Sequence, residues 1–408
     1  MCNFAFIKSF VMKKSIALLI YCLSVFFATA NDGVFYAAGN QLIPITETDI
    51  SVRKEVLTIN RVGDHLEVTV YYEFFNPVGE KELLVGFEAQ SPYNSGLDPI
   101  ELYPKHPHIH NFKVVLNGEP LRFDISHVDR GKYDNQNSYI LPTYYTSGQI
   151  KNWSKKMCED SLKAWDYAAY PFDYVYHFKA KFRPGLNIIQ HTYEYDLSFS
   201  VGEEFDFPYV LTAANRWANH QIDDFTLNIN MGDRESFRIK KSFFDKPTDW
   251  TIDGLGMAMN CDWPSWDTIE SGVIFHIQNG GVSFQQKNFH PDGELFVAKD
   301  HLIASMWNDW NSTQNTPEKE KLIKGIKTQY FSLDTAFISG YFEKSPQFTP
   351  EQRRILKNLP FAYRGYIFKT KALQNFFDSC AWYIRNSKYK GDMEEFTEKE
   401  KKWVEFWQ

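Results

Sequence analysis

The amino-acid sequence predicts a mainly β protein, an antiparallel β-sandwich with a helical insertion, followed by a small α-helical domain at its C-terminal end. Two observations indicate sheets: apolar and polar residues alternate in several runs, and turn dipeptides separate the runs. A third observation indicates the helical domain, because helix-capping patterns gather in the last part of the chain.

Strand-like alternation extends over much of the chain between residues 31 and 300. The runs with a two-residue period cover residues 66–74, 174–182, 189–199 and 225–231. They are separated by the turn dipeptides Gly63-Asp64, Asn117-Gly118 and Pro184-Gly185. Several short strands divided by turns favour two packed antiparallel sheets, so residues 31–300 are predicted to form the sandwich region.

One turn dipeptide carries a specific expectation. Asn279-Gly280 lies between two apolar runs, residues 273–278 and 282–287. Asn-Gly suits the left-handed dihedral angles of a two-residue hairpin loop. The sequence therefore predicts a tight hairpin at this point.

Two segments interrupt the β pattern. Apolar residues three or four positions apart predict a helical insertion near 149–169. After Lys299 the alternation stops, and Thr316-Pro317-Glu318 has the residue types of a helix start. Residues 301–347 are therefore predicted to form a connecting helix, at about 316–331, and a short linker.

The final segment, residues 348–408, has the clearest helix signals. Thr349-Pro350-Glu351-Gln352 and Thr397-Glu398-Lys399-Glu400 both match a capping box, and Thr370 is placed to cap a helix between them. We expect three helices. A domain of this size has a small core, which explains its many aromatic residues.

The first thirty residues have the composition of an export signal. Lys13 and Lys14 precede an apolar run that ends at Phe27, and Ala28-Thr29-Ala30 supplies small residues before a cut after Ala30. The uncharged span is shorter than the roughly 20 residues that cross a bilayer as a helix. The sequence therefore predicts a signal peptide at 1–30, export to the periplasm or cell surface, and no transmembrane span after cleavage.

Composition narrows the range of partners. The chain has 44 Lys and Arg against 51 Asp and Glu, a formal net charge of -7, and the predicted signal contains three lysines and no acid. Nucleic-acid binding requires clustered basic residues, so an acidic chain argues against it. Three cysteines follow the predicted signal at distant positions that match no zinc pattern, and no nucleotide or dinucleotide motif is present. We expect no cofactor and no metal.

Residues 353–383 resemble the YARHG domain, a small bacterial module associated with extracellular proteins. The resemblance rests on the lead-in Leu356-Lys357-Asn358 and on a set of motif residues that follows it. That set comprises Phe361, Ala362, Tyr363, Arg364, Gly365, Tyr366, Phe368, Trp382 and Tyr383. Tyr363 and Arg364 stand where the family has Arg and then His, so a role of that His cannot apply here. The resemblance implies a small exported module and supplies no catalytic activity.

The N-terminal part is similar to an uncharacterised exported bacterial family. The segments LEVTVYYEFFNP, KELLVGFEA and FRPGLNIIQHTYEY carry this similarity. These segments are strand patterns without chemical motifs. The similarity implies a fold and an export address for residues 31–299.

A segment rich in tryptophan and aspartate is the candidate binding site. It contains Trp250, Asp262, Trp263, Trp266 and Asp267. Aromatic faces with carboxylates can hold a sugar ring, and two suitably spaced carboxylates can hydrolyse a glycosidic bond. The alternative interpretation is that these tryptophans fill the core. If the acids face one aromatic-lined pocket, an enzyme is favoured; if the tryptophans lie between sheets, a binding or scaffold role is favoured.

Histidines form the remaining candidates. His106, His108 and His110 occupy alternate positions, so on an extended chain their side chains would point to one side, as the ligands of a metal ion do. The neighbouring prolines indicate a loop or strand entrance instead. His191 lies in the apolar row of its run, where a hydrogen-bonded core histidine is expected.

These observations favour an exported bacterial cell-envelope protein without enzymatic activity. It would bind or act as a scaffold through the β-sandwich and the YARHG-like module, with a cell-envelope glycan or an envelope protein as partner. The alternative is a glycan-acting hydrolase that uses residues 250–270.

Overall fold

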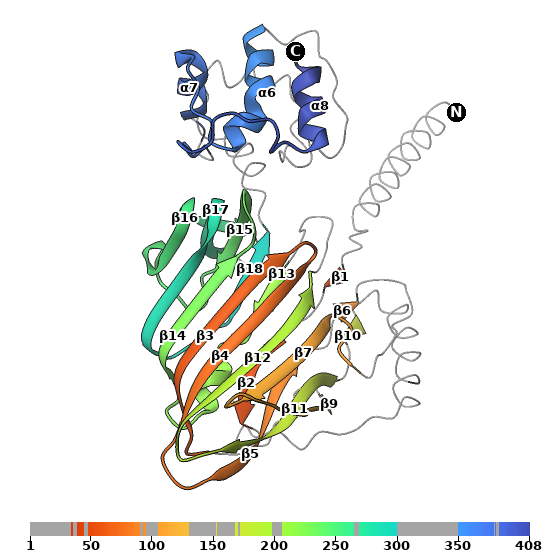
Figure 1. Cartoon of the computed structure of the whole chain (residues 1–408), viewed down its shortest axis with the longest axis vertical. Helices are drawn as coiled ribbons and strands as arrows, with labels where there is room; N and C mark the ends of the chain where they lie inside the picture. Colours follow the sequence, from red (N-terminus) through yellow and green to blue (C-terminus); the bar gives the residue numbers. More distant parts are fainter. Residues whose placement is uncertain are drawn as a thin grey trace, which may run out of the picture.

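The computed structural model is mainly β, with three α-helices at its C-terminal end, as the sequence predicts (Figure 1). It describes residues 34–35, 39–44, 48–89, 93–94, 105–129, 152, 168–169, 172–197, 206–264, 269–299, 350–378, 380 and 383–408. The predicted signal peptide, nearly all of the helical insertion at 149–169 and the connecting helix at 316–331 lie outside the described residues. The predicted domain boundaries remain predictions.

The strands form one large sheet, one small sheet and a three-stranded ribbon. The order in the large sheet is β13 (Asp206–Tyr209), β18 (Leu295–Lys299), β15 (Glu235–Lys240), β17 (Ile269–Phe289), β14 (Ile222–Asn230), β3 (Ser51–Val62), β4 (His65–Asn76), β12 (Gly185–Asp196), β7 (Ile109–Leu116) and β8 (Glu119–Pro120), with β16 (Trp250–Pro264) paired to β17. The order in the small sheet is β2 (Gly39–Pro44), β5 (Lys81–Ala89), β11 (Phe172–Phe182) and β9 (Asp124–Asp129). The ribbon joins β1 (Val34–Phe35), β6 (Tyr93–Asn94) and β10 (Ala168–Ala169).

Among the described strands, β3 and β14 form the one parallel pair, and every other pair is antiparallel. Two short 3-10 helices, η1 (Thr212–Arg216) and η2 (Pro247–Asp249), complete the body. The large sheet is therefore antiparallel, as the sequence predicts, except at this one pair.

The two sheets pack face to face around a shared aromatic core. Phe87 of β5 lies 5.0 Å from Tyr193 of β12 and 5.7 Å from Tyr176 of β11, measured between ring centroids. The inward residues of β4 are all buried, as the alternation between Leu66 and Phe74 predicts. One apolar cluster extends through both sheets, which is the arrangement of a sandwich.

Side-chain amides close the corners where the chain crosses from one sheet to the other. Asn76, at the end of β4, donates to the carbonyls of Gly79 and Phe182 at 2.9 and 3.3 Å. Asn187 of β12 accepts from the Arg183 amide and donates to its carbonyl. Since buried backbone groups need partners, these two asparagines stabilise the two crossings.

The predicted hairpin at Asn279-Gly280 is wrong. β17 runs unbroken through this dipeptide, and β16 pairs with it along its length. A two-residue loop of this type needs a positive φ at both positions, and of the two only Gly280 has one, at 96°. A Cβ at Gly280 would lie 1.8 Å from the Asp253 carbonyl oxygen, so glycine allows β16 and β17 to bend together here.

The C-terminal helices are α6 (Pro350–Tyr363), α7 (Lys371–Asp378) and α8 (Glu398–Phe406). The predicted capping box at Thr397 is confirmed, since its side chain accepts from the Glu400 amide and Glu400 accepts from the Thr397 amide. The helices enclose their own core, separate from that of the sandwich. Trp403 of α8 donates to the Leu356 carbonyl at 2.7 Å and ties α8 to α6.

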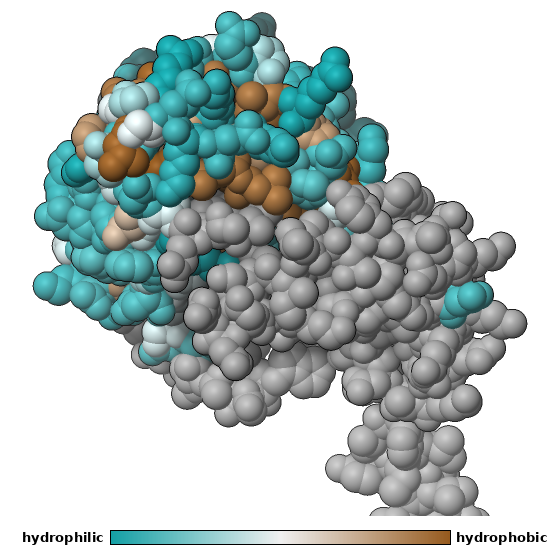
Figure 2. Space-filling view, turned by 90° about the horizontal axis from the view of Figure 1, so that it is seen from below, coloured by the Kyte–Doolittle hydropathy of each residue, from teal (hydrophilic) through white to brown (hydrophobic). Residues whose placement is uncertain are grey.

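No helix in the described part of the chain has the length and apolar character to cross a membrane. Figure 2 shows one end of the molecule, where hydrophilic residues dominate the described surface and hydrophobic residues gather in patches between them.

Candidate functional site

The structure describes the side chains of two of the five residues in the predicted binding segment, Trp250 and Asp262. Trp250 is 6% exposed and packs against Phe244 and Phe275, with ring centroids 5.6 and 5.5 Å away. It therefore belongs to the apolar core, as the alternative interpretation of these tryptophans expects. Asp262 is exposed on β16 and accepts a 2.6 Å hydrogen bond from Ser271.

The structure does not describe the side chains of the other three residues of this segment. The backbone of Trp263 belongs to β16, while Trp266 and Asp267 lie outside the described residues. The sugar-binding role of the five residues remains a prediction.

The three alternating histidines occupy different environments. His106 is 2% exposed, whereas His108 and His110 approach the same oxygen of Asp196, at 3.5 and 2.9 Å. Burial outweighs the attraction of Asp196 and lowers the pKa of His108 to about 4. Within the described ranges, no group of three metal-ligating side chains is arranged to hold a metal ion.

His191 lies in the core, as predicted, with no exposed surface. Its ring packs among Tyr72, Phe87 and Phe112. The predicted hydrogen bond is wrong, since neither ring nitrogen has a partner among the described residues. Burial lowers the pKa of His191 to about 3, so the ring is neutral.

The interior of the sandwich also contains a carboxylate that sequence reasoning missed. Glu55 of β3 is fully buried and stands opposite Tyr72 of β4. Burial, with Tyr72, Glu55 and Tyr193 nearby, raises the pKa of Tyr209 well above its usual value, so its hydroxyl stays protonated. The sequence contained one indication of this carboxylate: Glu55 lies two residues before Leu57, so strand alternation places both side chains on the inward face.

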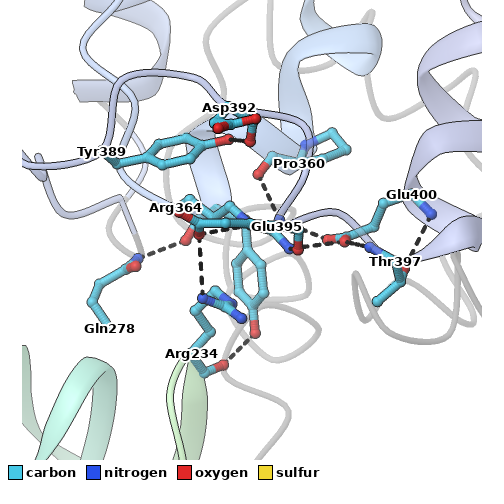
Figure 3. Close-up of polar contacts among 10 residues, drawn as sticks. Arg234, Gln278, Pro360, Arg364, Tyr389, Asp392, Glu395, Thr397 and Glu400 are labelled. Carbon is cyan, nitrogen blue, oxygen red and sulfur yellow. Dashed lines mark hydrogen bonds and ion pairs between the residues drawn. The ribbon is translucent and has the colours of Figure 1, made fainter.

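The YARHG-like motif forms the best-defined polar site, at the C-terminal end of α6 (Figure 3). Arg364 is 4% exposed and donates to both carboxylate oxygens of Glu400, each at 2.8 Å. It also donates to the carbonyls of Pro360 and Glu395 and lies 4.5 Å above the Phe396 ring. The guanidinium therefore joins α6 to the first turn of α8, as a bidentate pair can do in a buried site.

Tyr363, the preceding residue, joins the helical module to the sandwich. Its carbonyl accepts a 2.6 Å hydrogen bond from Gln278 of β17, and its hydroxyl donates to the carbonyl of Arg234 just before β15. Its ring lies 6.0 Å from that of His276. Figure 3 shows Gln278 and Arg234 reaching from the sheet toward the module. We call these four residues the junction.

The junction is largely buried, and Arg234 is its most exposed member. Gln278 is 3% exposed and His276 is fully buried, with its Nδ1 2.8 Å from the Ser236 hydroxyl. Burial lowers the pKa of His276 to about 4, so it is neutral near pH 7. On the outer side, Glu395 lies 4.0 Å from the Arg234 guanidinium. The contact between module and body is therefore a packed, hydrogen-bonded one.

The remaining motif residues close the loop after α6. Gly365 has φ 75°, and a Cβ there would lie 2.1 Å from the Ile384 carbonyl oxygen. Tyr383 donates to the Tyr366 carbonyl at 2.7 Å, and Phe368 stacks on Phe377. Phe361 and Ala362 belong to the helical cluster, and Trp382 lies outside the described residues.

Sequence reasoning named Arg364 as a motif residue and did not identify its partner. Both Arg364 and Glu400 are visible in the sequence, but they are separated by more than thirty residues. The available signal was the capping box at Thr397, because Glu400 is its acid and an acid held there can also receive an arginine.

Comparison with known proteins identifies the C-terminal part. No curated protein matches the chain. One of the solved structures that match is the crystal structure of a candidate nutrient binding protein from Legionella pneumophila, with 15% identity over 93% of this chain and 100% of that one and a TM-score of 0.47. Residues 334–408 match the YARHG domain family, in agreement with the motif and its buried contacts. The chain is therefore a YARHG domain-containing protein.

Proposed function

We propose that this chain is an exported protein of the bacterial cell envelope with a binding or scaffold role and no enzymatic activity. Three features support the proposal: the export-signal pattern at residues 12–30, the β-sandwich and the YARHG domain. YARHG domains are typical of exported proteins. The partner would be an envelope glycan or an envelope protein, in the periplasm or at the outer surface.

The observation that carries this proposal is that the hydrogen bonds of the motif residues are made within the protein. Arg364 donates four hydrogen bonds, to Glu400 and to two carbonyls, and Tyr363 is held through its carbonyl and its hydroxyl. Side chains bound in this way hold a structure together and are not available to react with a substrate. The motif therefore builds the module and fixes it to the sandwich, which suits a rigid binding protein.

The proposal is tested by fractionating bacteria that produce the full chain with a C-terminal tag. We expect the protein in the periplasmic or surface fraction, with a mass that corresponds to a cut after Ala30. Unprocessed protein in the cytosol would contradict export.

Binding is tested on the purified processed protein, by co-sedimentation with isolated envelope polysaccharide and with peptidoglycan. We expect retention on envelope material without release of sugar ends. Tyr363→Ala should undock the module, whereas Lys401→Ala, which alters an exposed pair in α8, is the matched control. Release of reducing sugar by the wild-type protein would overturn the non-enzymatic role, and absence of binding to any envelope fraction would overturn the binding role.

A further inference from the structure

The outward face of the large sheet contains a band of uncharged polar side chains. Strand register aligns two rows of residues across six strands. The first row is Ser283, Asn228, Thr58, Thr69, Thr192 and Lys113, and the second is Gln285, Thr226, Val56, Tyr71, Gln190 and Val115. All twelve are exposed or half-exposed, and only Lys113, at one end, has a charge. We call these two rows the neutral band.

Charged residues border the neutral band on both sides. On one side Lys287 and Asp224 form a 2.7 Å ion pair, and Lys54 stands opposite Glu73. On the other side Glu194 stands opposite Glu67. Apart from Lys113 at one end, the band contains no charged residue, and this ion pair and the opposed charges lie in the rows beside it.

The dimensions of the band follow from sheet geometry. Six strands about 4.8 Å apart give a length of about 24 Å, and rows two residues apart on a strand are separated by about 7 Å. In Figure 1 this face of β14, β3, β4, β12 and β7 is turned to the viewer, and no described segment crosses it. An extended chain molecule can lie across the strands over this length.

The side chains of the band provide hydrogen-bond donors and acceptors with few partners of their own. In the described structure, Asn228 contacts Thr58 at 3.5 Å and Tyr71 donates to Glu73 at 3.0 Å. Burial is the main cause that raises the pKa of Tyr71, so it remains a neutral hydroxyl with an aromatic ring. Hydroxyl, amide and aromatic groups together match the hydroxyls and the apolar ring faces of sugars.

Other classes of partner fit this surface less well. A protein partner would call for a core of aromatic residues, methionine and arginine, and the band offers one tyrosine and two valines. A polyanion would call for clustered lysine and arginine, and the band has one lysine beside rows that contain Glu67 and Glu194. Lack of charge combined with many hydroxyl and amide groups is complementary to a neutral, polyhydroxylated chain.

We propose that the neutral band binds a neutral polysaccharide laid across β17, β14, β3, β4, β12 and β7. This inference rests on the proposed binding function and names its surface and the chemical class of its ligand. It differs from the predicted segment at residues 250–270, because Trp250 lies in the core.

Affinity gel electrophoresis of the processed full chain tests the proposal, with hydroxyethyl cellulose, laminarin, pullulan and galactomannan as separate neutral probes and hyaluronate as the anionic probe. We expect retarded migration with at least one neutral polymer and none with hyaluronate. Thr69→Glu and Tyr71→Ala should each lower the affinity at least tenfold. Ser387→Glu, at an exposed position of the segment between α7 and α8 and away from the band, is the matched control and should leave the affinity unchanged.

Each variant is first compared with the wild type by circular dichroism and thermal unfolding, so that loss of binding is not confused with loss of fold. Migration unaffected by all four neutral polymers would overturn the proposal. Equal effects of Thr69→Glu and Ser387→Glu, or binding to hyaluronate alone, would also overturn it. If envelope retention persists in wild-type protein while every neutral probe fails, the proposed function stands and only this inference fails.

Discussion

Replacing Arg364 with alanine should unfold the helical module while the sandwich remains folded. The guanidinium makes four hydrogen bonds of 2.8 to 3.1 Å, two of them to the Glu400 carboxylate, and both side chains are almost fully buried. Arg364→Ala leaves Glu400 buried without its countercharge, and breaking a buried pair in this way costs about 3–5 kcal/mol.

That cost is large compared with the stability of the module. A domain of roughly 60 residues has a free energy of unfolding of about 3–9 kcal/mol at the usual value per residue. A loss of about 3 kcal/mol already lowers the midpoint of thermal unfolding of so small a domain by about 12 °C or more.

Hydrogen–deuterium exchange with mass spectrometry measures this effect, since peptides from α6 and α8 can be compared with peptides from β3 and β4. We expect strongly increased exchange in the helices and little change in the strands. Arg385→Ala is the matched control, because Arg385 and Asp378 form an exposed pair in the same module and should contribute little. Similar exchange in the two variants would refute the assignment of Arg364 as the central contact of the module.

Three further predictions concern the bend, the junction and the core. Gly280→Ala should lower the free energy of unfolding by more than about 1 kcal/mol, because φ is 96° and the new Cβ meets the Asp253 carbonyl. Urea unfolding measures this effect. Gly79→Ala is the control, because a Cβ at that position meets open space. Tyr363→Phe should cost about 1 kcal/mol and increase exchange at the start of β15, because the Arg234 carbonyl loses a donor; unchanged exchange there would contradict the docking role. His191 should make the protein less stable as the pH falls from about 6.5 toward 3, because burial lowers its pKa and the unfolded state therefore binds the proton more readily. The free energy of unfolding should fall by up to about 1.4 kcal/mol per pH unit over this range. His191→Phe should reduce this slope when unfolding is measured at several pH values.

Much of the fold was predictable because the sheets have one buried and one exposed face. The alternation between Leu66 and Phe74 fixes which residues of β4 face the core, and every inward residue there is buried. The capping box at Thr397 likewise marked the start of α8, since capping depends on neighbouring residues.

The errors arise where distant residues decide the outcome. Asn279-Gly280 has hairpin chemistry, yet β14, β15 and β16 pair with the flanking residues of β17 and hold it as one bent strand. Arg364 resembles the neighbouring exposed basic residues until Glu400 is brought beside it. A local pattern does not contain such pairings, so the junction could not be deduced from it, whereas the inward position of Glu55 follows from strand alternation with Leu57.

The parallel pairing of β3 with β14 has a consequence for the kinetics of folding. Residues 52–60 lie beside residues 222–230, so β3 cannot acquire its second neighbour until a long intervening chain has been synthesised. Pairings between remote segments form slowly because loop closure must come first. If the chain is exported as we propose, this delay would keep it unfolded during synthesis, in the state in which a polypeptide can be threaded through a translocation channel.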